Sequence, residues 1–105
     1  MVGSRGSAPL DRAVRVVGRP WTLLIIDVLS ASPCRFTVLM ERIPGISSNL
    51  LTERLRQLER AGVVTRIEDA KRPAVVRYAL TSFGGELIPV AVSLASWGTR
   101  LPADT

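Results

Sequence analysis

The side chains with the clearest capacity for specific chemistry lie within residues 47–60, where polar groups recur at helical spacing. Asparagine can pair bidentately with adenine and arginine with guanine, because their donors and acceptors match base edges in the major groove of DNA. Asn49 and Arg56 offer these two groups, and nearby hydroxyls add further donors. We predict that the segment contacts DNA through these residues: Ser47, Ser48, Asn49, Thr52, Glu53 and Arg56. The alternative is an ordinary solvated polar face.

Glu53 is the exception in this set, because phosphates repel a carboxylate. It suits a DNA-contacting face only where it accepts a hydrogen bond from a cytosine amine or pairs with Arg56, three residues later. In the first role Glu53 would also disfavour operators of the wrong sequence.

The boundaries of the helix that positions these groups are also present in the sequence. Ser47 or Ser48 can accept a backbone N–H in the first turn, and Gly62 suits the left-handed residue after the last turn. Opposite the polar face runs an apolar stripe of three leucines: Leu51, Leu55 and Leu58. Arg54 lies at the edge of this stripe, so we expect it to form a salt bridge within the domain rather than to contact DNA.

A second apolar stripe at helical spacing comes just before this helix and stops at Pro44-Gly45. Its members are Phe36, Leu39, Met40 and Ile43. Two helices joined by so short a turn predict a helix-turn-helix unit. An ordinary helical hairpin inside a small domain is the alternative.

After Gly62 the apolar period changes from 3.6 to 2, which predicts strands over residues 63–68 and 76–80. Residues 69–73 between them form a basic tip that contains a proline, and a basic hairpin behind a helix-turn-helix is the arrangement called a wing. A charged, solvated loop is the alternative. Outside the reading helix, the cations that we expect near DNA backbone are Arg19, Arg35, Lys71, Arg72 and Arg77.

Three more helices are expected: residues 9–17, residues 21–30 and a long helix from Thr81 to Trp97 with a kink at Pro89. Residues 21–30 are apolar almost all round, which predicts the most buried element. The first and last helices carry more apolar surface than one core needs, and we predict a dimer seam made of Leu10, Val14, Val17, Leu87, Ile88, Ala91 and Leu94. The alternative is that these residues fold back on their own chain.

Trp21 and Trp97 are candidates for an effector pocket at that seam, although a core role for both is the simpler expectation. Cys34, the single cysteine, comes just before a helix and beside Arg35, and both neighbours favour the thiolate form. The hypothesis is that oxidation or alkylation of Cys34 weakens DNA binding. The alternative is a partly buried thiol that takes no part in regulation.

Composition narrows the class of protein further. The 105 residues suit one domain, divided into a flexible tail (1–7), a DNA-binding and dimerisation domain (8–98) and a C-terminal tail (99–105). The net charge of +5 comes from 13 arginines and one lysine against 9 acids. Arginine suits phosphates and base edges, although a coding bias toward arginine accounts equally well for this excess.

Several kinds of chemistry find no support in the residues. The chain has no histidine, no ligand cluster with metal spacing, no phosphate-cradling glycine loop and no nucleophile paired with a base, so we expect neither an enzyme nor a cofactor. A lone cysteine argues against a disulfide framework. The longest apolar run, residues 21–29, is too short to span a bilayer, and we expect a cytoplasmic protein without membrane contact.

An ordered set of short motifs runs along the chain: Pro9-Leu10, Arg12-Ala13-Val14, Gly18, Trp21-Thr22-Leu23-Leu24-Ile25, Arg35-Phe36, Pro44-Gly45-Ile46-Ser47, Leu51-Thr52, Arg54-Leu55, Leu58-Glu59, Tyr78, Leu80-Thr81 and Gly84. These motifs give the chain, from about Ala8 to Gly98, a resemblance to the HxlR-type winged helix-turn-helix transcriptional regulators. It implies an α+β, mainly helical fold with a two-stranded wing and terminal dimerisation helices. It also implies a homodimer on a roughly palindromic operator, and many relatives sense electrophiles, oxidants or small molecules.

Three departures from the family pattern bear on function. Redox-sensing relatives often carry a cysteine immediately before the first proline, where this chain has Ala8, so that thiol switch is absent. Gly18-Arg19-Pro20 replaces a common Gly-Gly-Lys, which moves any phosphate contact there to Arg19. In the wing, Val75 stands where an arginine is common, leaving Lys71, Arg72 and Arg77 as substitutes.

The sequence thus predicts a sequence-specific transcriptional regulator, and a repressor rather than an activator, that binds a pseudo-palindromic operator as a homodimer. Its two reading helices would lie about 34 Å apart, one turn of DNA. A small molecule or electrophile is the expected effector. The alternative is a winged-helix scaffold that docks proteins through its apolar terminal helices and has no sequence-specific DNA binding.

Overall fold

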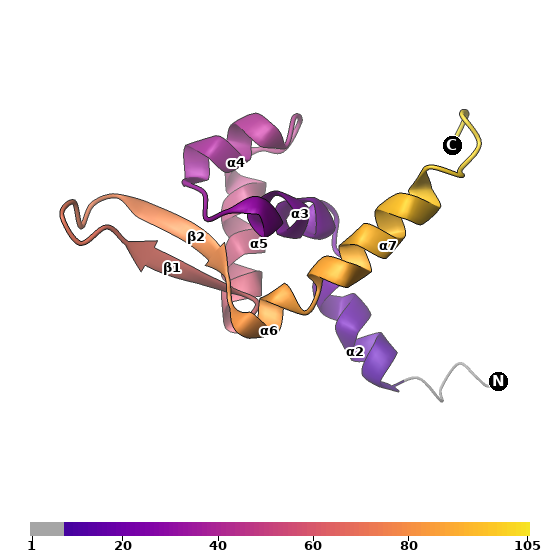
Figure 1. Cartoon of the computed structure of the whole chain (residues 1–105), viewed down its shortest axis with the longest axis horizontal. Coiled ribbons are helices and arrows are strands. Elements are labelled where there is room, and N and C mark those ends of the chain that lie inside the picture. The colour runs from indigo at the N-terminus through magenta and orange to yellow at the C-terminus, as the bar shows by residue number, and fades with distance from the viewer. Residues whose placement is uncertain (1–7) are drawn as a thin grey trace.

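The computed structural model describes residues 8–105, and the tail expected over residues 1–7 lies outside them. Helices α2 (Ala8–Val17), α3 (Thr22–Ala31), α4 (Phe36–Arg42) and α5 (Ser48–Arg60) come first. They are followed by strands β1 (Val64–Glu68) and β2 (Val76–Leu80) and by helices α6 (Ser82–Gly85) and α7 (Ile88–Gly98). Figure 1 shows α3, α4 and α5 packed together, with the two-stranded hairpin extending from one side and α2 and α7 from the other. The predicted α+β, mainly helical winged fold is confirmed.

The core lies where α3, α4 and α5 meet. The leucine stripe of α5 is buried against α3 and α4, and the large apolar side chains with almost no exposed surface are Ile25, Ile26, Leu39, Ile43, Leu51, Leu55 and Leu58. Helix α3 is the central element, but it is not buried on every side. Leu24 is 53% exposed and Asp27 is also exposed, so one face of α3 points away from the core.

The two helices of the helix-turn-helix are joined by a tight turn at Gly45, whose φ is +95°. A side-chain carbon at Gly45 would lie 3.3 Å from the indole ring of Trp21, so the turn packs closely against that ring. Trp21 itself has a φ of +77°, a left-handed conformation that is rare for a bulky residue, and it precedes α3 instead of starting it. The turn before α3 and the turn before α5 therefore support each other.

Strands β1 and β2 pair antiparallel, with Val64 opposite Leu80 and Glu68 opposite Val76. The middle of β2 is attached to the loop before α4, because Cys34 and Tyr78 exchange backbone hydrogen bonds of 2.9 and 2.7 Å. The expected alternation of buried and exposed residues does not occur in β1. Only Val64 is buried there, since the rest of the hairpin extends beyond the core.

The long kinked helix expected after Thr81 was wrong. The segment forms two helices, α6 and α7. Thr81 caps the start of α6, because its hydroxyl oxygen accepts a hydrogen bond of 2.9 Å from the backbone N–H of Gly84. Pro89 lies in the first turn of α7, where the missing N–H costs no helical hydrogen bond. The proline thus begins a helix instead of bending one. No helix in residues 8–105 is long and apolar enough to cross a membrane.

Candidate DNA-binding surface

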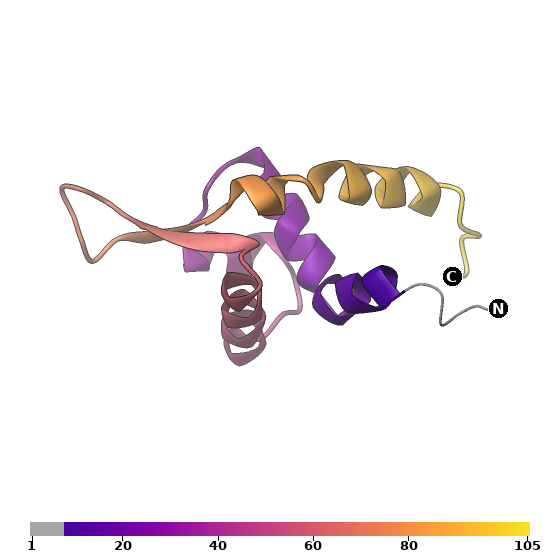
Figure 2. The same ribbon diagram turned by 90° about the horizontal axis from the view of Figure 1, so that it is seen from below.

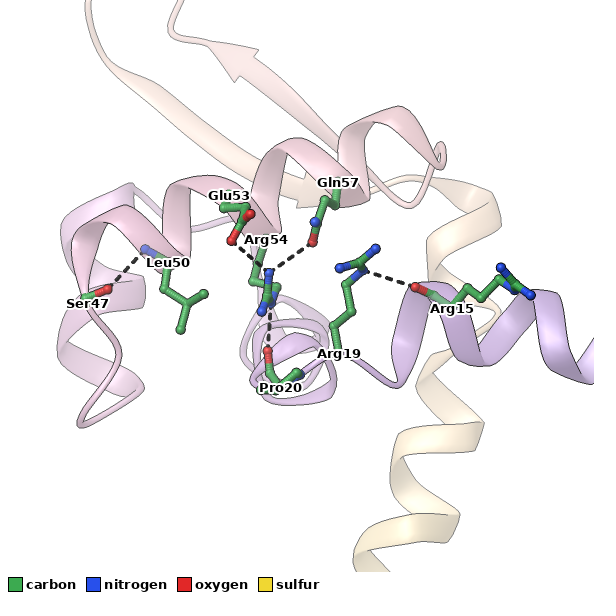
Figure 3. A network of polar contacts seen from close by, with 8 residues as sticks. All are labelled: Arg15, Arg19, Pro20, Ser47, Leu50, Glu53, Arg54 and Gln57. Carbon is green, nitrogen blue, oxygen red and sulfur yellow. Dashed lines mark hydrogen bonds and ion pairs between the residues drawn. The ribbon is translucent and has the colours of Figure 1, made fainter.

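The start of α5 is held by its own side chain. Ser47 accepts a hydrogen bond of 3.1 Å from the backbone N–H of Leu50, which satisfies one of the free donors of the first turn (Figure 3). The choice left open between Ser47 and Ser48 as cap is thereby decided for Ser47. Ser48 and Asn49 follow in the first turn and are exposed.

Farther along α5, the polar face contains one restrained and one unrestrained group. The Thr52 hydroxyl donates a hydrogen bond of 2.8 Å to the carbonyl oxygen of Ser48, so Thr52 is held against its own helix. Arg56 is exposed and makes no side-chain hydrogen bond or ion pair within residues 8–105. Among the expected readers, Asn49 and Arg56 therefore remain available to an external partner.

Glu53 does not pair with Arg56, as one of the two expectations for it required. Its carboxylate lies 3.1 Å from the guanidinium of Arg54. The side chain of Arg54 is only 10% exposed, and its Nε donates a hydrogen bond of 2.9 Å to the carbonyl oxygen of Pro20 (Figure 3). The intradomain role expected for Arg54 is confirmed. The guanidinium of Arg54 therefore partly compensates the negative charge of Glu53.

The wing tip is organised by Asp69, a residue that the sequence analysis did not single out. Its Oδ1 accepts hydrogen bonds from the backbone N–H groups of Lys71 (2.8 Å) and Arg72 (3.1 Å). Its second oxygen lies 3.9 Å from Arg77. Lys71 and Arg72 are consequently exposed at a turn of defined shape, whereas Arg77 is partly buried and paired. The Asp69-Ala70-Lys71 spacing of a side-chain-capped turn was the signal that could have revealed this role.

The remaining two expected backbone contacts lie on different sides of the core. Arg35 is exposed at the start of α4 and lines a shallow groove with Val75 and Tyr78, alongside β2. Arg19 is exposed in the turn after α2, where its Nε donates a hydrogen bond of 3.2 Å to the carbonyl oxygen of Arg15. Arg35 is thus close to the wing and Arg19 to α5.

Helices α5 and α7 lie on different sides of the body. In Figure 2, α5 lies in the lower part of the body below the wing, α2 lies at the lower right, and α7 lies along the upper side. Exposed apolar side chains gather on the terminal helices, among them Leu10, Val14, Val90, Val92, Leu94 and Trp97. Two expected seam residues, Val17 and Leu87, instead pack partly against the core of their own chain.

The core role expected for both tryptophans is confirmed for Trp21 only. Trp21 packs against the core beside Gly45, whereas Trp97 is 55% exposed on α7. Neither lines a cavity of about 600 Å³ that opens between α2, α6 and the end of α5. The lining of that cavity includes Pro9, Arg12, Val16, Val63, Phe83 and Leu87.

Cys34 is buried, with 5% of its surface exposed, and its Sγ donates a hydrogen bond of 3.4 Å to the carbonyl oxygen of Ser32. The thiol therefore faces protein rather than solvent. This arrangement fits the alternative in which Cys34 takes no part in regulation.

A helix-turn-helix with an exposed polar face on its second helix, followed by a hairpin with a basic tip, defines a winged helix-turn-helix DNA-binding protein. The family model of the HxlR-like helix-turn-helix proteins matches residues 16–104, and the chain belongs to that family. Its relatives are named as HTH-type transcriptional regulators.

The relative YodB of Bacillus subtilis is 35% identical over 99% of this chain and 95% of its own. Its quinone-bound crystal structure superimposes with a TM-score of 0.74 at 34% identity, covering 89% of this chain and 98% of that one. The redox regulator HypR in its oxidised form gives 0.83 at 28% identity, with 90% and 98% covered. A MarR-family regulator from Porphyromonas gingivalis W83 gives 0.84 at 25% identity, with 97% and 98% covered.

Proposed function

We propose that this protein is a transcriptional repressor that binds a pseudo-palindromic operator as a homodimer. The observation that carries the proposal is the separation of two surfaces. Helix α5, which carries exposed Asn49 and Arg56, lies on one side of the body, and α7, which carries exposed apolar residues, lies on another. A second copy can cover the apolar side without covering the reading face.

In the proposed complex the first turns of α5 enter the major groove. Asn49 and Arg56 read base edges, and each well-formed bidentate pair discriminates by about 1–3 kcal/mol. The wing tip, with Lys71 and Arg72 exposed, meets backbone phosphates and adds affinity without sequence preference. The two copies of α5 would lie about 34 Å apart, which matches one helical turn of DNA.

Footprinting on genomic fragments and on the palindrome recovered from them tests this assignment of roles. Arg56→Ala should relax the sequence preference, and Arg72→Ala should flatten the dependence of affinity on salt by a log–log slope of about 1 while leaving the preference unchanged. Unchanged operator affinity in both variants would show that the assigned surface is wrong. A promoter fusion then distinguishes repression from activation, since loss of the protein should raise transcription if it is a repressor.

The dimer has its own test by analytical ultracentrifugation. Leu94→Glu and Trp97→Glu place charges on the apolar face of α7, where both native side chains are largely exposed, and should yield monomers. Ile67→Glu is the matched control, because Ile67 is a similarly exposed apolar residue on the wing. Monomers from all the variants, or from none, would contradict a seam on α7.

The scaffold alternative predicts a different outcome in the same assays. A protein that docks partners through α2 and α7 would be indifferent to duplex sequence and salt, and Arg56→Ala would have no effect. Steep salt dependence combined with preference for a palindrome would exclude the scaffold.

We further propose that the cavity between α2 and α6 binds a small-molecule effector. Its volume of about 600 Å³ suits a small ligand, and the relative YodB was solved with a quinone. In a titration with benzoquinone, binding should raise the thermal midpoint and change operator affinity, and Phe83→Ala should remove both effects. A midpoint and an affinity that do not respond to benzoquinone would contradict this assignment.

A further inference from the structure

A second, smaller cleft lies between the end of α2 and the last turns of α5. Its volume is about 400 Å³, and it is lined by Arg15, Val16, Arg19, Gln57, Arg60 and Ala61. Figure 3 shows the guanidinium of Arg19 reaching from the turn after α2 toward α5, with its Nε held by the carbonyl oxygen of Arg15. Three arginines thus line one hollow, and there is no acidic residue among the described residues that line it.

The balance of charge around this cleft is positive. Asp11 pairs with Arg15 at 3.1 Å and compensates one of the three cations. Helices α2 and α5 both end here, and each C-terminus contributes about half a negative charge, which together compensate about one more. About one positive charge remains, on Arg19 and Arg60, and neither guanidinium forms an ion pair within residues 8–105.

Gln57 adds a neutral donor to the same cleft. Its side-chain oxygen accepts a hydrogen bond of 3.3 Å from Arg54, so its amide nitrogen is the part left to donate elsewhere (Figure 3). Two guanidinium groups and an amide are the donors that recognise a phosphate oxygen.

The position of the cleft along α5 also suits a contact with the DNA backbone. Arg60 follows Asn49 by eleven residues, or about 17 Å of helix, whereas the major groove of B-form DNA is about 12 Å wide. If the first turns of α5 reach bases, its last turn lies beyond the edge of the groove, where the sugar-phosphate backbone runs.

We propose that this cleft binds a single backbone phosphate beside each half-site, held by Arg19, Arg60 and Gln57. The inference rests on the proposed function, and it assigns a contact outside the reading helix's first turns and outside the wing. The contact would fix the position of α5 along the groove without reading any base.

The test measures operator affinity against salt for the intact dimer. The double variant Arg19→Ala/Arg60→Ala should lower the log–log slope by about 1 while leaving the preferred sequence unchanged, because one phosphate contact releases about one counterion. Arg100→Ala is the control, since Arg100 is an exposed arginine beyond α7. Arg60→Lys should restore most of the slope if charge, rather than packing, is what matters.

The outcomes separate this inference from the function on which it rests. A slope unchanged in the double variant, with the palindrome still bound and Arg56→Ala still relaxing preference, would overturn the cleft and leave the regulator intact. Failure of the native protein to prefer any duplex would overturn both. Titration with inorganic phosphate in the absence of DNA is the remaining probe, and it is followed by the NMR shift of the Gln57 side-chain amide. If that shift saturates, while the salt dependence of operator affinity is unchanged by substitution of Arg19 and Arg60, the site binds a free anion instead of a DNA phosphate.

Discussion

The guanidinium of Arg54 donates a hydrogen bond of 2.9 Å to the carbonyl oxygen of Pro20, across 34 positions of sequence. This bond joins the middle of α5 to the turn before α3. The neighbouring Trp21 packs against Gly45 in the turn before α5, so the same segment supports the reading helix at two points. The orientation of the proposed DNA-reading face therefore depends on a buried polar contact as well as on the leucine stripe.

Arg54→Ala should destabilise the fold by about 1–3 kcal/mol, because it leaves the Pro20 carbonyl oxygen without its partner and removes packing from a side chain that is 10% exposed. Urea unfolding measures the loss. Arg56→Ala, on the exposed face of the same helix, is the control and should change stability by less than about 0.5 kcal/mol. Equal effects from the two substitutions would contradict the structural role given to Arg54.

Ser47→Ala should cost about 1 kcal/mol of stability through loss of the cap on α5. Ser48→Ala is the matched control, because Ser48 is equally exposed and its hydroxyl does not cap the helix. Thermal or urea unfolding compares the two variants. If Ser48→Ala is the more damaging change, the helix begins one residue later than described.

For substitution of Asp69, the change in charge and the change in structure predict opposite effects on operator affinity. Removing its negative charge should favour DNA binding, yet Asp69→Ala should weaken operator affinity severalfold, because the two backbone hydrogen bonds that shape the wing tip are lost. Asp69→Asn keeps an acceptor oxygen and removes the charge, so its affinity should equal or exceed that of the native protein. Tighter binding by Asp69→Ala would show that the tip needs no defined shape.

Cys34 should be slow to react with a soluble thiol reagent in the folded protein and quick to react in urea, because 5% of its surface is exposed. Cys34→Ser can keep the hydrogen bond to the Ser32 carbonyl oxygen and should retain native operator affinity, with or without oxidant. A gel-shift assay measures both. An oxidant response that disappears with Cys34→Ser would restore the regulatory hypothesis.

Local patterns in the sequence were sufficient for most of the helices and for the hairpin. The leucine stripe, the cap at Ser47 and the left-handed Gly62 define α5 from its own sequence. The alternation of apolar and polar residue types located β1 and β2, although only Val64 of β1 is buried. Pro89 was misjudged because the same ring that disrupts a helix interior is favoured in a first turn. The sequence does not say in advance which of the two positions a proline occupies.

The periodicity of the chain determined by itself which residues form helices, which form strands and which face of α5 is polar. Only the tertiary structure decided that Glu53 pairs with Arg54, that Trp21 packs against the core while Trp97 is exposed, and that Arg19 and Arg60 border one cleft. The physical reason is the separation along the chain of the residues that interact. Helical and strand periods arise between neighbours along the chain, whereas these relationships depend on how α2, α3 and α5 pack and on where their ends meet.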